Sequence, residues 1–293
     1  MRRIVFSVSN SYEGISLRSF LRSYVKISSR LCAKLKRQPG GISRNGLPVK
    51  APDTLHSGDL IALCLQEGEE KAVPVPIPVR IIWEDPDLLI CDKPAEMPMY
   101  PCPGHPCDSL ENAVAYIQLQ AHKTFTYRPV YRLDQGTTGL VILAKNAYAA
   151  SRLAGSVQKT YLAVCEGKLA GSGLIDKPIG LKPGHTIQRA VIACGDCAVT
   201  RWRTIFCTGS CSFIAVHLKT GRTHQIRVHF SDFGHPLAGD DMYGGSRKEI
   251  TRPALHCAEI HFRHPVTGKA IRLRSALPED MLILLKGNRN DEK

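Results

Sequence analysis

The chain has 293 residues, of which 43% are hydrophobic and 22% are charged, values typical of a globular protein and not of a disordered one. Lys and Arg number 39 against 26 Asp and Glu, and the resulting net charge of +13 favours a polyanionic partner, with nucleic acid first and an anionic membrane surface second. No apolar run approaches the roughly 20 residues of a membrane span, and the N-terminus turns polar too early for a signal peptide, so we expect a cytoplasmic protein without membrane contact.

A chain of this length can hold two domains, and residues 14–65 predict a small first one. Ser16 and then Ser28 or Ser29 are good N-cap residues for two short helices. Both helices carry almost unmixed positive charge, which favours contacts with phosphates over a merely solvated face. The basic residues in question are Arg18, Arg22, Lys26, Arg30, Lys34, Lys36 and Arg37.

The rest of this unit predicts β-structure and then a linker. The Asn45-Gly46 turn predicts a hairpin, and the apolar run 60–65 predicts a strand. Residues 66–79 begin charged and then alternate prolines with apolar residues, a pattern that cannot sustain a β-ladder and favours an extended linker. We therefore expect a second, larger domain over residues 80–285.

Local patterns in the second unit predict its first elements. Two strand-like runs around an acidic turn predict a hairpin over 80–94, and Ser109 caps a helix with one apolar face. The run 140–144 predicts a buried strand, and 158–167 predicts another strand that ends in glycine. Residues 226–233 predict a short helix, although two-residue alternation fits nearly as well over so short a span.

The polar, glycine-bearing segment that precedes the strand at 140–144 reads as a loop held at the end of that strand. Loops on a rigid scaffold often carry function. This loop places one carboxylate, Asp134, beside Arg132. Taken alone, such a pair is more often a surface ion pair than a catalytic site.

Four cysteines are candidates for a metal site. Cys194 and Cys197 form a C-x-x-C, with Cys207 and Cys211 a short way on, and four thiolates at such spacing can hold zinc tetrahedrally. Against this, the second pair is spaced by three residues and Cys211 opens an apolar strand. We favour ordinary reduced cysteines in the core or in loops, and we expect no metal.

Two signatures carry a family resemblance. Arg132-Leu133-Asp134 and the Gly136-Thr137-Thr138-Gly139-Leu140 that follows resemble a signature of the RluA family of RNA pseudouridine synthases. The family usually has His where this chain has Tyr131, and Ser where it has Thr138. The second signature is Thr-Gly-Arg-Thr-His-Gln-Ile-Arg-Val-His at 220–229, with Gly-His-Pro-Leu, Gly-Asp and Tyr-Gly after it, an order too long for chance.

The resemblance implies that uridine in RNA is isomerised to pseudouridine, a reaction that needs no cofactor. It implies catalytic roles for Asp134, Tyr161 and Arg227, and substrate-binding roles for Arg132, Arg222 and His224. A carboxylate can act as nucleophile and then be released. To stay ionised in a pocket that holds little water, it needs a fixed cation, which is the role implied for Arg227. Tyr161 matches the aromatic residue that stacks on the target base.

The implied fold is an α+β catalytic domain with a mixed, largely antiparallel sheet flanked by helices and loops, behind a small N-terminal α/β RNA-binding domain of the S-four type. We expect a monomer that acts on large-subunit ribosomal RNA, since a flexibly linked basic module suits a large structured substrate; transfer RNA comes next. The alternative is a catalytically silent RNA-binding or ribosome-assembly factor, which would not need Asp134, Tyr161 and Arg227 together. A zinc deaminase is disfavoured because the chain lacks a His-x-Glu with Pro-Cys-x-x-Cys.

Overall fold

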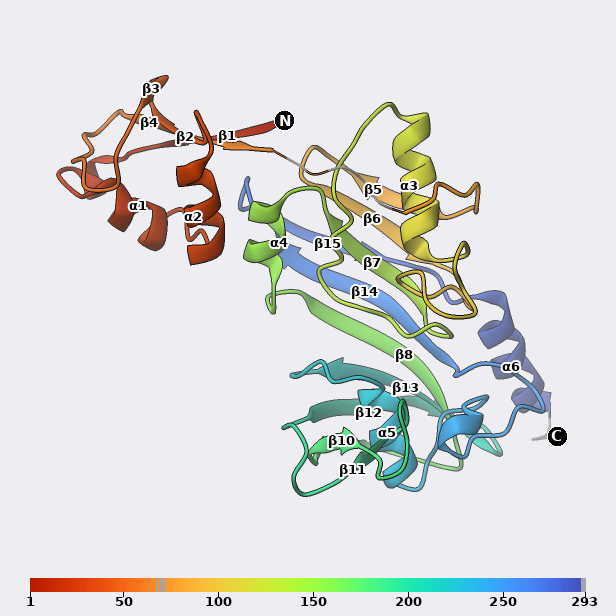
Figure 1. Cartoon of the computed structure of the whole chain (residues 1–293). Coiled ribbons are helices and arrows are strands. Elements are labelled where there is room, and N and C mark those ends of the chain that lie inside the picture. Colours follow the sequence, from red (N-terminus) through yellow and green to blue (C-terminus); the bar gives the residue numbers. More distant parts are fainter. Residues whose placement is uncertain (67, 69–71, 291–293) are drawn as a thin grey trace.

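The structure, a computed structural model, describes residues 1–66, 68 and 72–290 (Figure 1). The charged part of the linker expected at 66–79 lies largely outside these described residues. Among the described residues, no helix has both the length and the apolar character needed to cross a membrane.

The N-terminal unit is a four-stranded antiparallel sheet with two helices, in the strand order β1-β4-β2-β3. Its elements are β1 (Arg2–Ser7), the 3-10 helix η1 (Asn10–Tyr12), α1 (Leu17–Ser23), α2 (Ser29–Arg37), β2 (Ile42–Arg44), β3 (Leu47–Pro48) and β4 (Leu60–Leu65). The side chains of Ser16 and Ser28 cap the two helices, and the hairpin turns at Asn45-Gly46, as the sequence predicts. Strand β1 extends this unit before residue 14, where the sequence patterns placed its start.

The larger unit is built on a nine-stranded sheet in the order β5-β6-β7-β14-β8-β13-β12-β9, with β15 also beside β14 (Figure 1). Within the described residues the β7–β14 pairing is parallel and the other pairings are antiparallel, so the predicted α+β fold with a mixed, largely antiparallel sheet is confirmed. The strands are β5 (Arg80–Glu84), β6 (Leu88–Lys93), β7 (Thr138–Ala144), β8 (Gln158–Glu166), β9 (Ser172–Asp176), β12 (Val199–Cys207), β13 (Cys211–Leu218), β14 (Leu255–Arg263) and β15 (Ala270–Arg274). A separate hairpin pairs β10 (Ile179–Leu181) with β11 (Arg189–Val191).

The helices cover both faces of this sheet. They are α3 (Leu110–Gln120), α4 (Ala147–Leu153), α5 (Gln225–Asp232), the 3-10 helix η2 (Asp241–Tyr243) and α6 (Glu279–Asn290). Successive side chains of a strand point to opposite faces. In β8, Ala163 packs in the core that includes α5, whereas Val164 packs against Met281 of α6. Helices α5 and α6 therefore lie on opposite faces.

Strand β7 lies at the centre of the core. All seven of its residues are buried, as expected for the run at 140–144. At Gly139 the backbone has φ +111°, and an added Cβ would lie 2.4 Å from the carbonyl oxygen of Cys257. Only glycine allows β7 and β14 to approach this closely.

The two units also contact each other directly. Tyr148 of α4 is buried within the core of the N-terminal unit, and its hydroxyl donates a 3.2 Å hydrogen bond to the carbonyl of Val25. Arg2 of β1 donates hydrogen bonds of 2.9 and 2.8 Å to both carboxylate oxygens of the buried Asp87. The N-terminal unit is thus held by contacts besides the linker, in contrast to the flexible attachment expected from sequence.

Candidate active site

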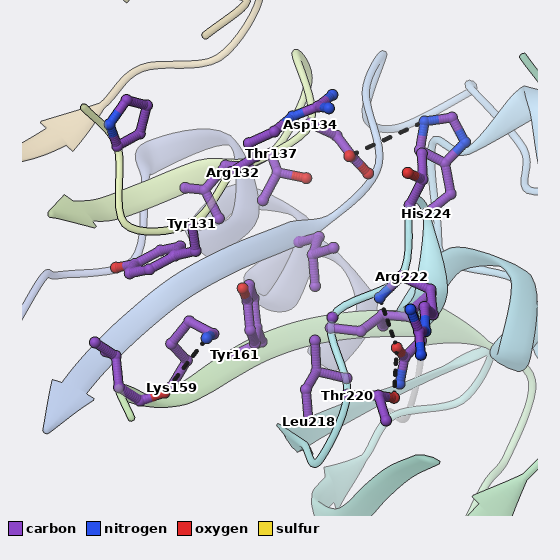
Figure 2. A pocket seen from close by; sticks show the side chains of 18 of the residues that line it. Tyr131, Arg132, Asp134, Thr137, Lys159, Tyr161, Leu218, Thr220, Arg222 and His224 are labelled. Atoms are coloured by element: carbon purple, nitrogen blue, oxygen red, sulfur yellow. Dashed lines mark hydrogen bonds and ion pairs between the residues drawn. The ribbon is translucent and has the colours of Figure 1, made fainter. Parts of the chain in front are cut away.

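A pocket of about 590 Å³ opens beside the central strands. It is lined by the loop before β7, by side chains of β8, and by the turn that joins β13 to α5 (Figure 2). The six residues singled out from the sequence all line it: Arg132, Asp134, Tyr161, Arg222, His224 and Arg227. The fold therefore brings together residues that are up to 95 positions apart, from Arg132 to Arg227.

A buried lysine fixes the loop that carries Asp134. Lys93 is 1% exposed, and its ammonium donates hydrogen bonds of 2.8, 2.8 and 2.9 Å to the carbonyls of Pro94, Met97 and Gln135. Burial lowers the pKa of Lys93 to about 7, and the nearby Asp134 carboxylate opposes that shift. Three acceptors match the three N–H groups of a charged ammonium.

A second basic side chain, that of Arg252, supports the same loop. Arg252 donates a 3.1 Å hydrogen bond to the carbonyl of Gly136, and it is itself fixed by hydrogen bonds of 2.7 and 2.8 Å to Asp280. The loop therefore rests on two basic side chains from other parts of the chain. This arrangement limits the positions that the Asp134 carboxylate can take.

Asp134 faces two basic groups across the pocket. Its side chain is 25% exposed, and one oxygen lies 3.6 Å from Nη1 of Arg227. The other oxygen lies 4.0 Å from Nε2 of His224 (Figure 2). Neither distance is that of a good hydrogen bond. The carboxylate is thus close to positive charge and still has oxygen lone pairs that face the pocket.

The guanidinium of Arg227 is oriented by Asp240. Two hydrogen bonds of 2.7 Å join its Nε and Nη2 to the carboxylate of Asp240, which is 0% exposed. Burial alone would lower the pKa of Arg227, but the hydrogen bonds and charge of Asp240 outweigh burial and raise it. The ring of Tyr243 packs 4.9 Å from the guanidinium carbon. The charge that faces Asp134 is therefore permanent and fixed in direction.

His224 begins helix α5 in a left-handed conformation, with φ +57°. Such a conformation is uncommon for a residue other than glycine and is often found at functional sites. The Nδ1 atom of His224 lies 2.8 Å from the hydroxyl of Tyr243. Burial lowers the pKa of His224, and the Asp134 carboxylate acts against that shift. The imidazole is therefore biased toward its neutral form.

Tyr161 projects from β8 into the pocket (Figure 2). It is 5% exposed, and burial raises its pKa well above the ordinary value of tyrosine, with the Cys257 thiol and the Asp134 carboxylate adding to the shift. Its hydroxyl therefore stays protonated near neutral pH. The group offers an aromatic face and a hydrogen-bonding hydroxyl and is a poor base.

Sequence reasoning missed several groups that shape this site. They are Lys93, Asp240, Tyr243 and Arg252. Asp240 and Tyr243 stood within a recognised signature, but nothing local to the sequence indicated that they contact Arg227 and His224. The contacts depend on a loop that folds back onto α5, which no periodicity reveals.

The four cysteines considered as zinc ligands do not gather in the part of the chain that the structure describes. Cys194 and Cys197 are exposed, whereas Cys211 is buried at the start of β13. Among the described residues, one group of three side chains has the spacing of metal ligands: Asp85, Asp87 and His264. Asp87 is already paired there with Arg2, so this group forms part of the contact between the units.

The chain is similar to known proteins over most of its length. Residues 87–232 match the family model described as RNA pseudouridylate synthase. The chain is 37% identical over 269 residues to an uncharacterised RNA pseudouridine synthase of Bacillus subtilis (strain 168), covering 89% of this chain and 95% of that protein. It is 35% identical over 288 residues to ribosomal large subunit pseudouridine synthase D of Pseudomonas aeruginosa, covering 90% and 88%. The solved structure of human RNA pseudouridylate synthase domain containing 4 shares the fold, with a TM-score of 0.57 and 21% identity over 72% of this chain and 93% of that one.

Proposed function

The chain belongs to the RluA-type family of RNA pseudouridine synthases, and from this premise we propose that it modifies large-subunit ribosomal RNA with Asp134 as its catalytic carboxylate. The observation that supports the proposal most directly is that Asp134, Arg227 and Tyr161 line one pocket, with the Asp134 carboxylate 3.6 Å from the Arg227 guanidinium. A silent RNA-binding protein would not need these three groups to converge.

The reaction exchanges one bond between base and sugar for another. The bond from N1 of uracil to the ribose is broken, the base turns in place, and C5 is joined to the same ribose carbon. The proton on C5 then leaves, its electron pair restores the ring double bond, and N1 takes up a proton. Atoms and charge balance, so no cofactor or energy source is required.

Each side chain has a role that its surroundings support. Asp134 acts as the nucleophile toward the sugar or the base and is then released. Arg227, held by Asp240, supplies a fixed positive charge beside the Asp134 carboxylate. Tyr161 stacks on the uracil, since its aromatic side chain lines the pocket. Its protonated hydroxyl can donate a hydrogen bond there.

The remaining three residues serve RNA binding in this proposal. Arg132 fills the gap that the target nucleotide leaves when it is turned out of its stack, which offsets part of a cost of a few kcal/mol. Arg222 and His224 hold backbone phosphates at the turn that opens α5. The side chain of Arg222 donates a 3.0 Å hydrogen bond to the carbonyl of Cys197, in the segment before β12.

We propose the N-terminal unit as an RNA-binding domain of the S-four type. The basic side chains of α1 and α2 support this assignment, together with the net charge of +13. Ribosomal RNA is favoured over transfer RNA because a relative that matches over 90% of this chain carries ribosomal large subunit in its name. We further propose a cytoplasmic monomer, since the six predicted site residues come from one chain.

The decisive experiment is tritium release from RNA that carries tritium at C5 of uracil, because pseudouridine formation must expel that hydrogen. Ribosomal and transfer RNA transcripts are incubated with the wild-type protein and with Asp134→Asn. We expect release by the wild type from ribosomal RNA and none by the variant. If neither protein released tritium from any RNA although both bound RNA tightly, the result would support an RNA-binding factor without catalytic activity.

A further inference from the structure

We propose that Lys159 binds a backbone phosphate of the RNA beside the target nucleotide, and that Tyr131 positions its ammonium group for this contact. The proposal rests on the proposed function in one respect, namely that RNA occupies this pocket. It gives a role to two residues that the reaction described above does not use.

Lys159 stands beside the residue proposed to stack on the base. It precedes Tyr161 by two positions in β8, so both side chains lie on the same face of the strand, roughly 7 Å apart along it. Both line the pocket, and Figure 2 shows Lys159 at the end of the pocket away from Asp134, with Tyr161 between them. The ammonium is thus placed to contact the RNA backbone next to the flipped nucleotide. It is too far from Asp134 to contact the reacting atoms of that nucleotide.

The ammonium of Lys159 has no carboxylate partner among the ion pairs of the described residues. It donates one 3.3 Å hydrogen bond, to the carbonyl of Val157, and lies 4.6 Å from the centre of the Tyr131 ring. Arg227, in the same pocket, forms an ion pair with the buried carboxylate of Asp240. A half-buried cation without an anion is unfavourable unless a ligand supplies the negative charge. Burial lowers the pKa of Lys159, which agrees with an unpaired group.

Tyr131 is fixed beneath this ammonium. Its hydroxyl donates a 2.9 Å hydrogen bond to the carbonyl of Leu140 in β7, so the ring keeps one orientation. The face of the ring attracts the cation of Lys159 and holds it over the pocket. In this chain the tyrosine therefore supplies an uncharged ring face that does not compete with Lys159 for an anion.

A phosphate is the ligand that fits these surroundings best. An ammonium is a compact point charge that suits a phosphate oxygen and has no planar fork for reading a base. RNA presents one such anion at every nucleotide. The proposed reaction needs the uracil ring near Tyr161 and Asp134, which leaves the Lys159 end of the pocket to a phosphate (Figure 2).

The first test is the salt dependence of RNA binding. Asp134→Asn protein, which leaves the RNA unconverted, is compared with the same protein carrying Lys159→Met, a change that keeps an unbranched side chain but removes the charge. We expect weaker binding and a slope of log Kd against log salt that is smaller by about 0.7, the loss of one contact to single-stranded phosphate. Lys286→Met, on the exposed surface of α6, is the matched control. An unchanged slope would overturn the proposal.

A second test locates the anion. Single phosphates around the target uridine are replaced one at a time by uncharged methylphosphonates. At one linkage we expect the protein with Lys159 to lose affinity and the Lys159→Met protein to lose none. Equal losses at every linkage would mean that Lys159 has only a structural role. Tritium release by the wild type is independent of this result, so failure here leaves the proposed reaction intact.

The part played by Tyr131 is tested by a double-mutant cycle. Tyr131→Leu removes the ring, and we expect it to weaken binding about two- to fivefold when Lys159 is present and not at all in the Lys159→Met background. Tyr131→Phe keeps the ring and should retain most of the coupling. Additive effects of Tyr131→Leu and Lys159→Met would overturn the positioning role.

Discussion

Asp240 accepts two 2.7 Å hydrogen bonds from Arg227, whereas the same guanidinium comes no closer than 3.6 Å to Asp134. The arginine is thus oriented by a buried carboxylate. This leaves the Asp134 carboxylate near a positive charge without tying up its oxygens in short hydrogen bonds. This arrangement suits the role proposed for Asp134, whose oxygens stay accessible beside a fixed positive charge.

We therefore expect Asp240→Asn to lower kcat about tenfold or more, because Arg227 loses the charge that orients it. Breaking a buried ion pair also costs about 3–5 kcal/mol of unfolding free energy. Both are measured on one preparation, by tritium release and by urea unfolding. Asp241→Asn, at the neighbouring exposed position, should change neither. Unaltered kcat in Asp240→Asn would contradict the orienting role.

Lys93 gives the stability of the protein a distinctive pH dependence. An unfolded lysine keeps its proton up to about pH 10.4. Native Lys93 releases its proton near pH 7, because burial lowers its pKa to about 7. Between these values the unfolded state binds more protons, so the contribution of Lys93 to the unfolding free energy rises with pH. Below pH 7 the full cost of the buried charge is present.

We expect the difference in unfolding free energy between wild type and Lys93→Met to increase from pH 6 to pH 9.5. Urea unfolding at several pH values measures it, and titrating groups common to both proteins cancel in the difference. The exposed Lys123, changed to Met, should give a flat difference. A difference that stays level or falls with pH for Lys93→Met would refute the lowered pKa of native Lys93.

Gly139→Ala should be strongly destabilising. A residue with Cβ at positive φ costs about 1–2 kcal/mol. The contact of 2.4 Å with the carbonyl of Cys257 adds overpacking worth about 1–3 kcal/mol. Gly155 also has positive φ, but a Cβ there meets nothing within 4 Å. Gly155→Ala therefore measures the cost of the backbone conformation alone. Equal losses of stability in the two variants would show that β7 and β14 do not restrict residue 139.

The contact between the two units should make them unfold together. Tyr148→Ala removes a buried ring from their interface, and we expect a loss of about 3–5 kcal/mol and a separate, earlier transition of the N-terminal unit in calorimetry. Tyr148→Phe keeps the ring and loses only the hydrogen bond to Val25, so its cost should be about 1 kcal/mol and unfolding should remain a single transition. A single transition in Tyr148→Ala would argue against an interface centred on this residue.

Local sequence signals predicted the parts of the fold that local forces decide. Ser16 and Ser109 cap helices as expected, and the run 140–144 is a fully buried strand. The ambiguous segment 226–233 is helical because its apolar side chains pack into the core behind the pocket; Ile226 and Phe230 are both buried there. These outcomes follow from periodicity and capping, which act within a few residues.

The remaining features arise from pairings between distant segments, which carry no local signature. Strand β1 joins the N-terminal sheet only by pairing with β4, and β14 inserts between β7 and β8. Likewise, the sequence could place Arg227 in the site by resemblance, but not the Asp240 that holds it. The convergence of the six predicted residues in one pocket was inferred from the family signatures and not from any calculation of spacing.

The position of β14 in the sheet determines when the pocket can form during synthesis of the protein. A ribosome releases the Asp134 loop and Tyr161 well before it has made residues 255–263, yet that strand lies between β7 and β8 and sets the spacing of the two groups. A nascent chain that stops short of β14 therefore contains Asp134 but lacks the strand that completes the pocket around it. Closing so long a loop is slow compared with forming hairpins. Modification of RNA thus has to wait until β14 has been synthesised and has paired with β7 and β8.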